Sequence, residues 1–147
     1  MKITIFSDGG ARGNPGPAGI GCVIRQRDEE TKRQRDKEIS RYIGEATNNQ
    51  AEYRAVIEAL KWIKETERQK DKETKRDLEI EFFLDSELVV EQLNQRYKVK
   101  NEGLKPLFWQ VRDLIFELGG RITFRYISRE KNKEADRLVN QAIDKRV

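Results

Sequence analysis

Residues 2–19 read KITIFSDGGARGNPGPAG, a strand pattern followed by the densest run of glycine and proline in the chain. In Lys2–Asp8, two isoleucines alternate with the residues of the opposite face, which is typical of a strand, and the strand ends on an acidic side chain. Glycine and proline interrupt regular strands, so Gly9–Gly19 is expected to form a loop. The fold is therefore expected to begin with a strand whose carboxyl end carries Asp8.

Two more strands are expected after this loop, at Ile20–Arg27 and Lys37–Ile43. Between them, Arg27–Asp36 carries charges of both signs and no apolar residue, which is typical of a solvated hairpin tip. The first three strands are therefore expected to form an antiparallel meander, in which each strand pairs with the next one along the chain.

The middle of the chain favours a long helix followed by a strand. Thr47 and Asn48 are good N-cap residues, and apolar residues follow them at helical spacing. The helix is expected to pass Lys64 into the polar segment KETERQKDKETKRD, which predicts a projecting helix end and a loop rather than a second domain. The strand pattern resumes at Leu78–Asp85, LEIEFFLD, and again ends on an aspartate.

The last third of the chain alternates helices with one more strand. A right-handed crossover allows the first strand and Leu78–Asp85 to lie side by side and parallel, with helices on the sheet faces. Sites form beyond the carboxyl ends of parallel strands, so Asp8 and Asp85 are expected to converge. The remaining expected elements are a short helix at 86–95, a helix at 104–118 that stops at Gly119-Gly120, a strand at Arg121–Ile127, and a helix that begins at Glu130 or Asn132.

Composition limits the chemistry that the chain is able to perform. Its 147 residues fit one domain, and a net charge of +4 with a pI near 9.2 weakly favours polyanionic partners. The chain has no run of about 18 apolar residues, so no membrane span is predicted. A single cysteine, Cys22, and the absence of histidine exclude an intramolecular disulfide, a Cys/His zinc site and histidine-dependent triads. Catalysis is left to carboxylates, amides, hydroxyls, Lys, Arg or a hard metal ion.

Four carboxylates stand out by position from the others, most of which lie in runs of mixed charge. Asp8 and Asp85 end apolar strands beside small residues. Glu52 flanks the apolar stripe of the first helix within TNNQAEY, and Asp136 holds a similar place within NKEADRL. Taken singly, each is explained as a turn residue, a helix cap or a solvated side chain. Taken together they predict an acidic site, whose mutual repulsion hard cations would balance.

Four motifs occur in the order found in one enzyme family: SDGGARGNPGPAG, TNNQAEY, FLDSELVVEQLNQRYKVKN and REKNKEADRL. With them the chain resembles the ribonuclease H type 1 family over essentially its whole length, and most of all its compact archaeal and bacterial branch. The resemblance implies a single domain over residues 1–147 with the ribonuclease H-like α/β fold. That fold is a five-stranded mixed sheet of three antiparallel and then two parallel strands, in the spatial order 3-2-1-4-5, with helices on both faces.

The resemblance also implies an activity. Family members are endonucleases that hydrolyse the RNA strand of RNA–DNA hybrids and leave 5′-phosphate and 3′-hydroxyl ends. Two Mg²⁺ ions, for which Mn²⁺ is expected to substitute, serve this reaction by clamping the scissile phosphate. The metal-binding and catalytic carboxylates implied here are Asp8, Glu52, Asp85 and Asp136.

Residues that would contact the hybrid also follow from the resemblance. Amide side chains both donate and accept, which suits reading of a ribose 2′-hydroxyl. Asn14, Asn48 and Asn49 match the family's substrate-contacting asparagines, although a turn also explains Asn14 and a helix cap explains Asn48. Thr47 and Asn101 match positions that hold a phosphate of the DNA strand. The expected partner is an RNA–DNA hybrid, bound by a cytoplasmic monomer with no membrane attachment.

The sequence departs from the family pattern in three places. Many members carry a histidine in the loop before the last helix, where this chain has Arg129 and Lys131, which suit phosphate contact but not proton transfer near neutral pH. Glu87 stands where some members have Gln, and it is expected either to approach a metal ion or to lie in the first turn of its helix, where negative charge is favoured. The basic protrusion of some members is absent. A smaller basic cluster, or simply a solvated face, takes its place at Arg96, Lys98, Lys100 and Lys105.

Two other functions remain open from the sequence alone. A non-catalytic hybrid-binding module would share the fold, but it has no need of all four acidic residues. A resolvase or integrase core of the wider nuclease superfamily would share the acidic residues. Asn14 and Asn48 fit the reading of a 2′-hydroxyl better than they fit that alternative.

Overall fold

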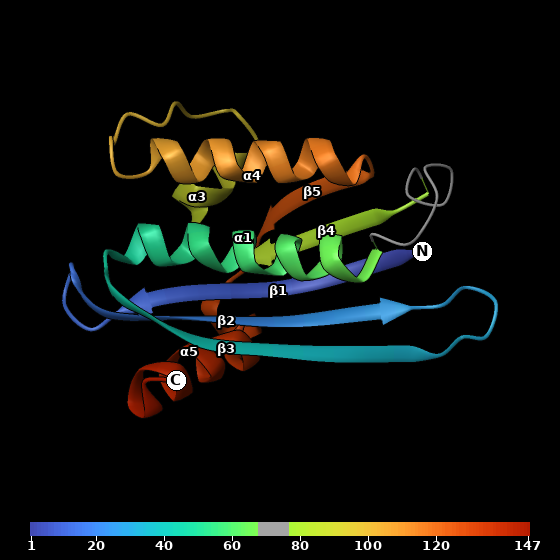
Figure 1. The fold of residues 1–147 in the computed structure, drawn as a ribbon, viewed down its shortest axis with the longest axis horizontal. Helices are drawn as coiled ribbons and strands as arrows, with labels where there is room; N and C mark the ends of the chain where they lie inside the picture. Colours follow the sequence, from blue (N-terminus) through green and yellow to red (C-terminus); the bar gives the residue numbers. More distant parts are fainter. Residues whose placement is uncertain (68–76) are drawn as a thin grey trace.

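Five strands form one mixed sheet in the part of the chain that the computed structural model describes, residues 1–67 and 77–147 (Figure 1). They are β1 (Lys2–Ala11), β2 (Gly16–Arg27), β3 (Gln34–Ala46), β4 (Glu79–Leu84) and β5 (Arg121–Tyr126). Their order in the sheet is β3-β2-β1-β4-β5, with antiparallel pairing from β3 to β1 and parallel pairing from β1 to β5. The predicted fold class and strand order are confirmed.

Helices cover both faces of this sheet, as predicted. Figure 1 shows α1 (Asn48–Glu67) and α4 (Lys105–Leu118) on one side and α5 (Lys133–Lys145) on the other. Neighbouring residues of a strand point to opposite faces, and a Cβ on Gly9 would meet α1 whereas one on Gly10 would meet α5. A short helix, α3 (Glu87–Leu93), follows β4. No helix among the described residues has the length and apolar character needed to cross a membrane.

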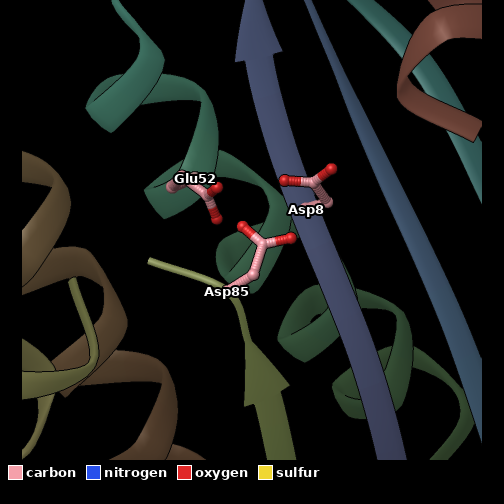
Figure 2. A group of neighbouring side chains, drawn as sticks. All are labelled: Asp8, Glu52 and Asp85. Carbon is pink, nitrogen blue, oxygen red and sulfur yellow. The ribbon is translucent and has the colours of Figure 1, made fainter. Parts of the chain in front are cut away.

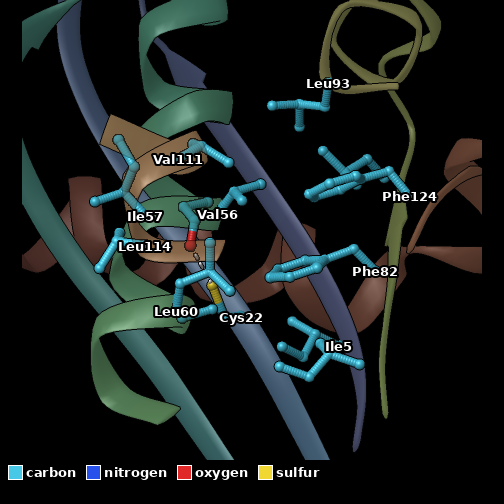
Figure 3. Close-up of a cluster of buried hydrophobic side chains, with 14 of the residues drawn as sticks. Ile5, Cys22, Val56, Ile57, Leu60, Phe82, Leu93, Val111, Leu114 and Phe124 are labelled. Atoms are coloured by element: carbon cyan, nitrogen blue, oxygen red, sulfur yellow. Dashed lines mark hydrogen bonds between the residues drawn. The ribbon is translucent and has the colours of Figure 1, made fainter. Parts of the chain in front are cut away.

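The main core lies between the sheet and the helices α1 and α4 (Figure 3). Phe82 of β4 and Phe124 of β5 stack there with their ring centroids 5.2 Å apart. Burial of each large apolar side chain contributes roughly 1.5–3 kcal/mol, so this layer holds both helices on the sheet. The other core side chains labelled in Figure 3 are Ile5, Cys22, Val56, Ile57, Leu60, Leu93, Val111 and Leu114.

A buried hydrogen bond ties α1 to α3. Tyr53 is fully buried, and its hydroxyl donates to Oε1 of Gln92 over 2.8 Å. Tyr53→Phe leaves that oxygen without its donor, so the free energy of unfolding should fall by about 1–3 kcal/mol, measured by urea denaturation. Tyr97→Phe, at a half-exposed tyrosine, serves as the control and should change it by less than about 0.5 kcal/mol. Equal effects of the two substitutions would show that the bond does not stabilise the fold.

The predicted loop at Gly9–Gly19 is wrong at both ends. β1 continues to Ala11 and β2 begins at Gly16, so only residues 12–15 connect the two strands. Strand pairing passes through the glycines, because Gly9 pairs with Ile20 and Gly10 pairs with Gly19. The glycines in this segment make room for helices instead of ending the strands.

Gly9 allows α1 to lie directly against β1. A Cβ at this position would come within 2.2 Å of the backbone carbon and oxygen of Ala51, so no larger residue fits. On the other face, a Cβ on Gly21 would come within 2.3 Å of the carbonyl oxygen of Ala135 in α5. Glycine is required at both positions for the close approach of two backbones.

The other element boundaries agree with the expected ones to within a few residues. β3 runs from Gln34 to Ala46 because it stays paired with β2 beyond the predicted Lys37–Ile43. The hairpin tip between β2 and β3 is exposed, as predicted. The last helix begins after Asn132, and a 3-10 turn at Arg129–Lys131 precedes it. The loop predicted to follow α1 falls mainly on residues 68–76, which lie outside the described residues.

Candidate active site

Three carboxylates from distant parts of the chain lie together at one end of the sheet (Figure 2). Asp8 comes from β1, Glu52 from α1, and Asp85 from the residue that follows β4. One oxygen of each carboxylate lies within 4.8 Å of one oxygen of each of the others. The structure therefore brings Asp8 and Asp85 together, as the parallel strands predicted, and adds Glu52 to them.

The end of strand pairing positions Asp8 and Asp85. The parallel pairing of β1 with β4 stops at Phe6 and Phe83. Asp85 leaves the sheet just beyond that point, where Ser86 caps α3 through its hydroxyl oxygen. β1 continues past it in pairing with β2, so Asp8 lies inside a strand and not at its end as predicted.

The close contact between α1 and β1 positions Glu52. Ala51, whose backbone lies against Gly9, directly precedes Glu52, and Gly9 directly follows Asp8. The contact that fixes the helix on the strand therefore also fixes these two carboxylates relative to each other. The backbone N–H of Gly9 donates to Oδ1 of Asp8 over 2.9 Å, which orients that side chain further.

Burial and mutual repulsion change the protonation of this group. Asp8 is 7% exposed and Glu52 is 6% exposed. Burial first, and the charge of Asp85 second, raise the pKa of Asp8 from 3.8 to about 7. Burial, and then the charge of Asp8, raise the pKa of Glu52 well above its ordinary value. Without a cation, these close carboxylates do not all ionise near neutral pH.

The donor set fits a hard divalent cation. Among residues 1–67 and 77–147, no Lys or Arg forms an ion pair with Asp8, Glu52 or Asp85. Within the same residues, Oε2 of Glu52 is buried and has no hydrogen-bond partner. A divalent cation would both neutralise the carboxylates and occupy this oxygen. Mg²⁺ and Mn²⁺ prefer oxygen ligands of this kind.

Asp136 lines the same cavity as the three carboxylates but does not belong to their close cluster. It is exposed in the first turn of α5, and together with them it lines a cavity of about 590 Å³. Its charge contributes to the raised pKa of Asp8, after burial and the charge of Asp85. Asn140 donates from Nδ2 to the backbone oxygen of Asp136 over 3.1 Å and to its Oδ2 over 3.4 Å. The fourth predicted carboxylate therefore faces the same cavity from the opposite helix layer.

The predicted asparagines fasten the start of α1 to the end of β1 and the loop that follows it. Oδ1 of Asn14 accepts from the backbone N–H of Asn48 over 2.9 Å, and Oδ1 of Asn48 accepts from that of Ala11 over 2.8 Å. Asn48 and Asn49 line the cavity, whereas Asn14 lies outside its lining. These bonds give Asn14 and Asn48 a structural role, and their contact with a hybrid stays a prediction.

The other three predicted contact residues lie in different surroundings. Thr47 rather than Asn48 caps α1, because its hydroxyl accepts from the N–H of Gln50 over 3.2 Å while its own N–H donates to Oε1 of Gln50 over 2.9 Å. Asn101 is exposed and lies outside the cavity lining, where its Oδ1 accepts a backbone N–H over 2.7 Å. Arg129 lines the cavity.

Two of the departures from the family pattern, Glu87 and the basic cluster, lie outside the cavity lining. Glu87 is exposed in the first turn of α3 and is absent from the cavity lining, which favours its interpretation as a helix-start residue. Two members of the basic cluster form ion pairs on the surface: Arg96 with Glu91 at 2.7 Å and Lys105 with Glu102 at 2.8 Å. These pairs reduce the positive charge that the cluster offers to a nucleic acid.

Two residues of this region were not singled out by the sequence. Arg12 lines the cavity and forms an ion pair with Asp144 at 2.6 Å. Asn132 is buried and donates from Nδ2 to Oδ2 of Asp85 over 3.0 Å. The sequence marked Asn132 only as a helix start. Its place four residues before Asp136 in REKNKEADRL was the one available signal.

A mixed sheet of this order, with acidic residues on the first strand, on the first helix and after the fourth strand, defines the ribonuclease H-like class of α/β proteins. Residues 6–142 match a family model described as reverse transcriptase-like. Ribonuclease H of Erythrobacter litoralis is 33% identical over 158 residues, which cover 97% of this chain and 96% of that relative. The chain belongs to the ribonuclease H type 1 family of enzymes.

Two further relatives cover almost the whole chain. LC11-RNase H1, isolated from compost, is 45% identical in its structure with an RNA/DNA hybrid, and the match covers 97% of both chains with a TM-score of 0.82. A bifunctional protein of Mycobacterium tuberculosis is 41% identical over 144 residues, which cover 98% of this chain. The chain spans only 36% of the length of that mycobacterial relative.

Proposed function

We propose that this chain is an endonuclease that hydrolyses the RNA strand of RNA–DNA hybrids and leaves 5′-phosphate and 3′-hydroxyl ends. The observation that carries the proposal is the convergence of Asp8, Glu52 and Asp85 within 4.8 Å, in a cavity that Asp136 also lines. Further support comes from the similar LC11-RNase H1, whose structure contains an RNA/DNA hybrid. The orphaned oxygen of Glu52 and the raised pKa of Asp8 both favour a cation at this site.

We also propose that Asp8, Glu52, Asp85 and Asp136 hold two Mg²⁺ ions during catalysis, or Mn²⁺ in their place. When bound, such ions supply Lewis acidity for an in-line displacement by water at the scissile phosphate. The chain itself holds the carboxylates in place, through the N–H of Gly9 on Asp8 and the amide of Asn140 on Asp136. Burial of Asp8 and Glu52 limits competition from bulk water for their oxygens.

Three contact residues of the hybrid are proposed from their place in the cavity lining. Asn48 and Asn49 line it beside Glu52, which suits reading of a 2′-hydroxyl close to the scissile phosphate. Arg129 places a positive charge in the same lining as the carboxylates, which suits contact with a phosphate. The resemblance to the family adds three residues outside the lining: Asn14 for the 2′-hydroxyl, and Thr47 and Asn101 for a phosphate of the DNA strand.

We propose that the protein acts as a cytoplasmic monomer. RNA–DNA hybrids form where the genome is copied and transcribed, and two of the relatives named above come from bacteria. Size-exclusion chromatography with light scattering tests the monomer, for which a mass near 17.3 kDa is expected. Cell fractionation tests the location.

A labelled RNA–DNA hybrid tests the activity directly. Cleavage of the RNA strand is expected with Mg²⁺ and none with EDTA, and phosphatase treatment of the product should reveal a 5′-phosphate. Double-stranded RNA and a four-way DNA junction serve as controls. Tight binding of the hybrid without cleavage would identify a non-catalytic module, and cleavage of the junction alone would identify a resolvase.

Activity should rise with pH between 6 and 8. Mg²⁺ requires ionised ligands, and a pKa of about 7 leaves roughly a tenth of Asp8 ionised at pH 6 in the metal-free protein. The concentration of Mg²⁺ for half-maximal activity should therefore fall by about tenfold from pH 6 to pH 8. Without the loop histidine of many members, turnover should also be slower and should continue to rise toward alkaline pH. An activity optimum near pH 6 would contradict both expectations.

A further inference from the structure

Asn132 connects the elements that carry the carboxylates. It lies directly before α5 and is 1% exposed. Its Nδ2 donates to the backbone oxygen of Ser7 over 2.9 Å and to Oδ2 of Asp85 over 3.0 Å. Ser7 precedes Asp8 on β1, so one amide group bonds both to the strand of Asp8 and to the Asp85 carboxylate itself.

The orientation of this amide group follows from its partners. The carbonyl oxygen of Ser7 and the ionised carboxylate of Asp85 are acceptors, so an amide turned by half a rotation would place Oδ1 against both. Oδ1 of Asn132 is buried and has no hydrogen-bond partner in the described part of the chain. The side chain therefore keeps its two N–H contacts, and its own oxygen, Oδ1, stays unpaired.

The backbone of Asn132 reaches the fourth carboxylate. Its carbonyl oxygen accepts from the N–H of Asp136 over 3.1 Å, in the first turn of α5. Because the side chain is bonded to β1 and to Asp85, the start of α5 is held relative to the strand that carries Asp8 and to the residue that follows β4. A single residue thus links Asp85 through its side chain and Asp136 through its backbone.

We infer that Asn132 is a positioning residue for the divalent-cation site, holding Asp85 beside Asp8 and fixing the start of the helix that carries Asp136. The inference rests on the proposed function. Asn132 acts through the carboxylates and has no assigned contact with the hybrid. Replacement of a group that orients a ligating side chain typically lowers metal affinity or activity by 10- to 100-fold.

Asn132→Ala tests this role, with Asn94→Ala as the matched control. Asn94 also donates from Nδ2 to a backbone oxygen, that of Phe124, over 3.0 Å, but it contacts none of the carboxylates of the site. Asn132→Ala should raise the Mg²⁺ concentration for half-maximal thermal stabilisation by about tenfold. It should lower kcat at limiting Mg²⁺ while KM for the hybrid stays within about twofold. Asn94→Ala should leave the Mg²⁺ midpoint and kcat unchanged.

The outcomes separate a positioning role from a purely structural one. If Asn132→Ala loses stability but keeps the Mg²⁺ midpoint and kcat of the unsubstituted protein, the inference is overturned. If the variant does not fold, nuclear magnetic resonance of the unsubstituted protein decides. Saturation with Mg²⁺ should shift the side-chain amide signal of Asn132 and leave that of Asn94 in place, and an unmoved Asn132 signal overturns the inference.

The unsubstituted protein distinguishes this inference from the proposed function. If it neither binds Mg²⁺ nor cleaves the hybrid, both proposals fall together. If it cleaves the hybrid with Mg²⁺ while Asn132→Ala behaves as Asn94→Ala does, only the positioning role of Asn132 is wrong.

Discussion

Replacement of Asp8 by asparagine is expected to lower the rate of hybrid cleavage at least about a thousandfold, equivalent to about 4 kcal/mol of transition-state stabilisation. Asp8 lies within 4.8 Å of both Glu52 and Asp85, so its loss removes the carboxylate that joins β1 to the other two. Hybrid binding should persist, because an amide of the same shape adds no negative charge against the phosphates. Single-turnover cleavage with Mg²⁺ and fluorescence anisotropy in EDTA measure the two effects separately.

The same substitution should stabilise the metal-free protein. Burial raises the pKa of Asp8 from 3.8 to about 7, so between these pH values the folded chain keeps a proton that the unfolded chain releases. Stability therefore falls as the pH rises from about 4 to about 7, by up to roughly 4 kcal/mol for this group. Asp8→Asn removes that loss. The gain should be absent near pH 4, grow as the pH rises, and reach its full size above about pH 7.

The control for both effects is Asp113→Asn, which removes the same charge from an exposed position on α4. It should leave cleavage unchanged and alter the free energy of unfolding by less than about 0.5 kcal/mol at any pH. Urea denaturation in EDTA at pH 5 and pH 8 supplies the measurement. An Asp8→Asn protein that is less stable than the unsubstituted protein at pH 8 would falsify the electrostatic account of the site.

Gly9→Ala is expected to cost at least about 3 kcal/mol of stability, which is a large fraction of the total for a domain of this size. The added Cβ would lie 2.2 Å from two backbone atoms of Ala51. Neither β1 nor α1 is free to move away, because side chains of both pack in the main core. Displacement of α1 would also move Glu52, so cleavage should fall as well.

Gly10→Ala is the matched control for this substitution. It lies one residue further along the same strand, and its added Cβ would meet only ordinary contacts, at 3.6 Å from Val139 and 4.0 Å from Asn48. Its expected effect is below about 1 kcal/mol, since both substitutions change the entropy of the unfolded chain equally. Similar losses for the two variants would show that the contact with α1 is not what requires glycine.

The arrangement of Asp8 and Asp85 was predictable because it follows from strand direction. Two parallel strands that each carry an aspartate near the carboxyl end bring those side chains to one edge. The extent of the strands was not predictable in the same way. Gly9 and Gly10 look like loop residues in a sequence, and only the position of the helices shows that they continue a strand.

The contacts of the asparagines also required the folded chain. The motifs marked Asn14 and Asn48 for the substrate, but their amide oxygens accept backbone N–H groups that come from β1 and from the start of α1. Asn132 was not distinguished from other polar residues, because its burial depends on how α5 docks against β1 and β4. Local patterns locate acidic and amide groups, whereas their hydrogen-bond partners depend on tertiary packing.

The strand glycines bring α1 and α5 close to the sheet at one end. Where β1 begins, the full side chains of Ile3 and Ile5 separate the layers, whereas at Gly9 and Gly21 the helices touch bare backbone. Asp8 and Glu52 therefore lie directly beside the contact between helix and strand backbones, next to Gly9 and Ala51. Larger side chains at these positions of β1 and β2 should therefore lower the rate of catalysis, because they would move the carboxylates apart without replacing any of them.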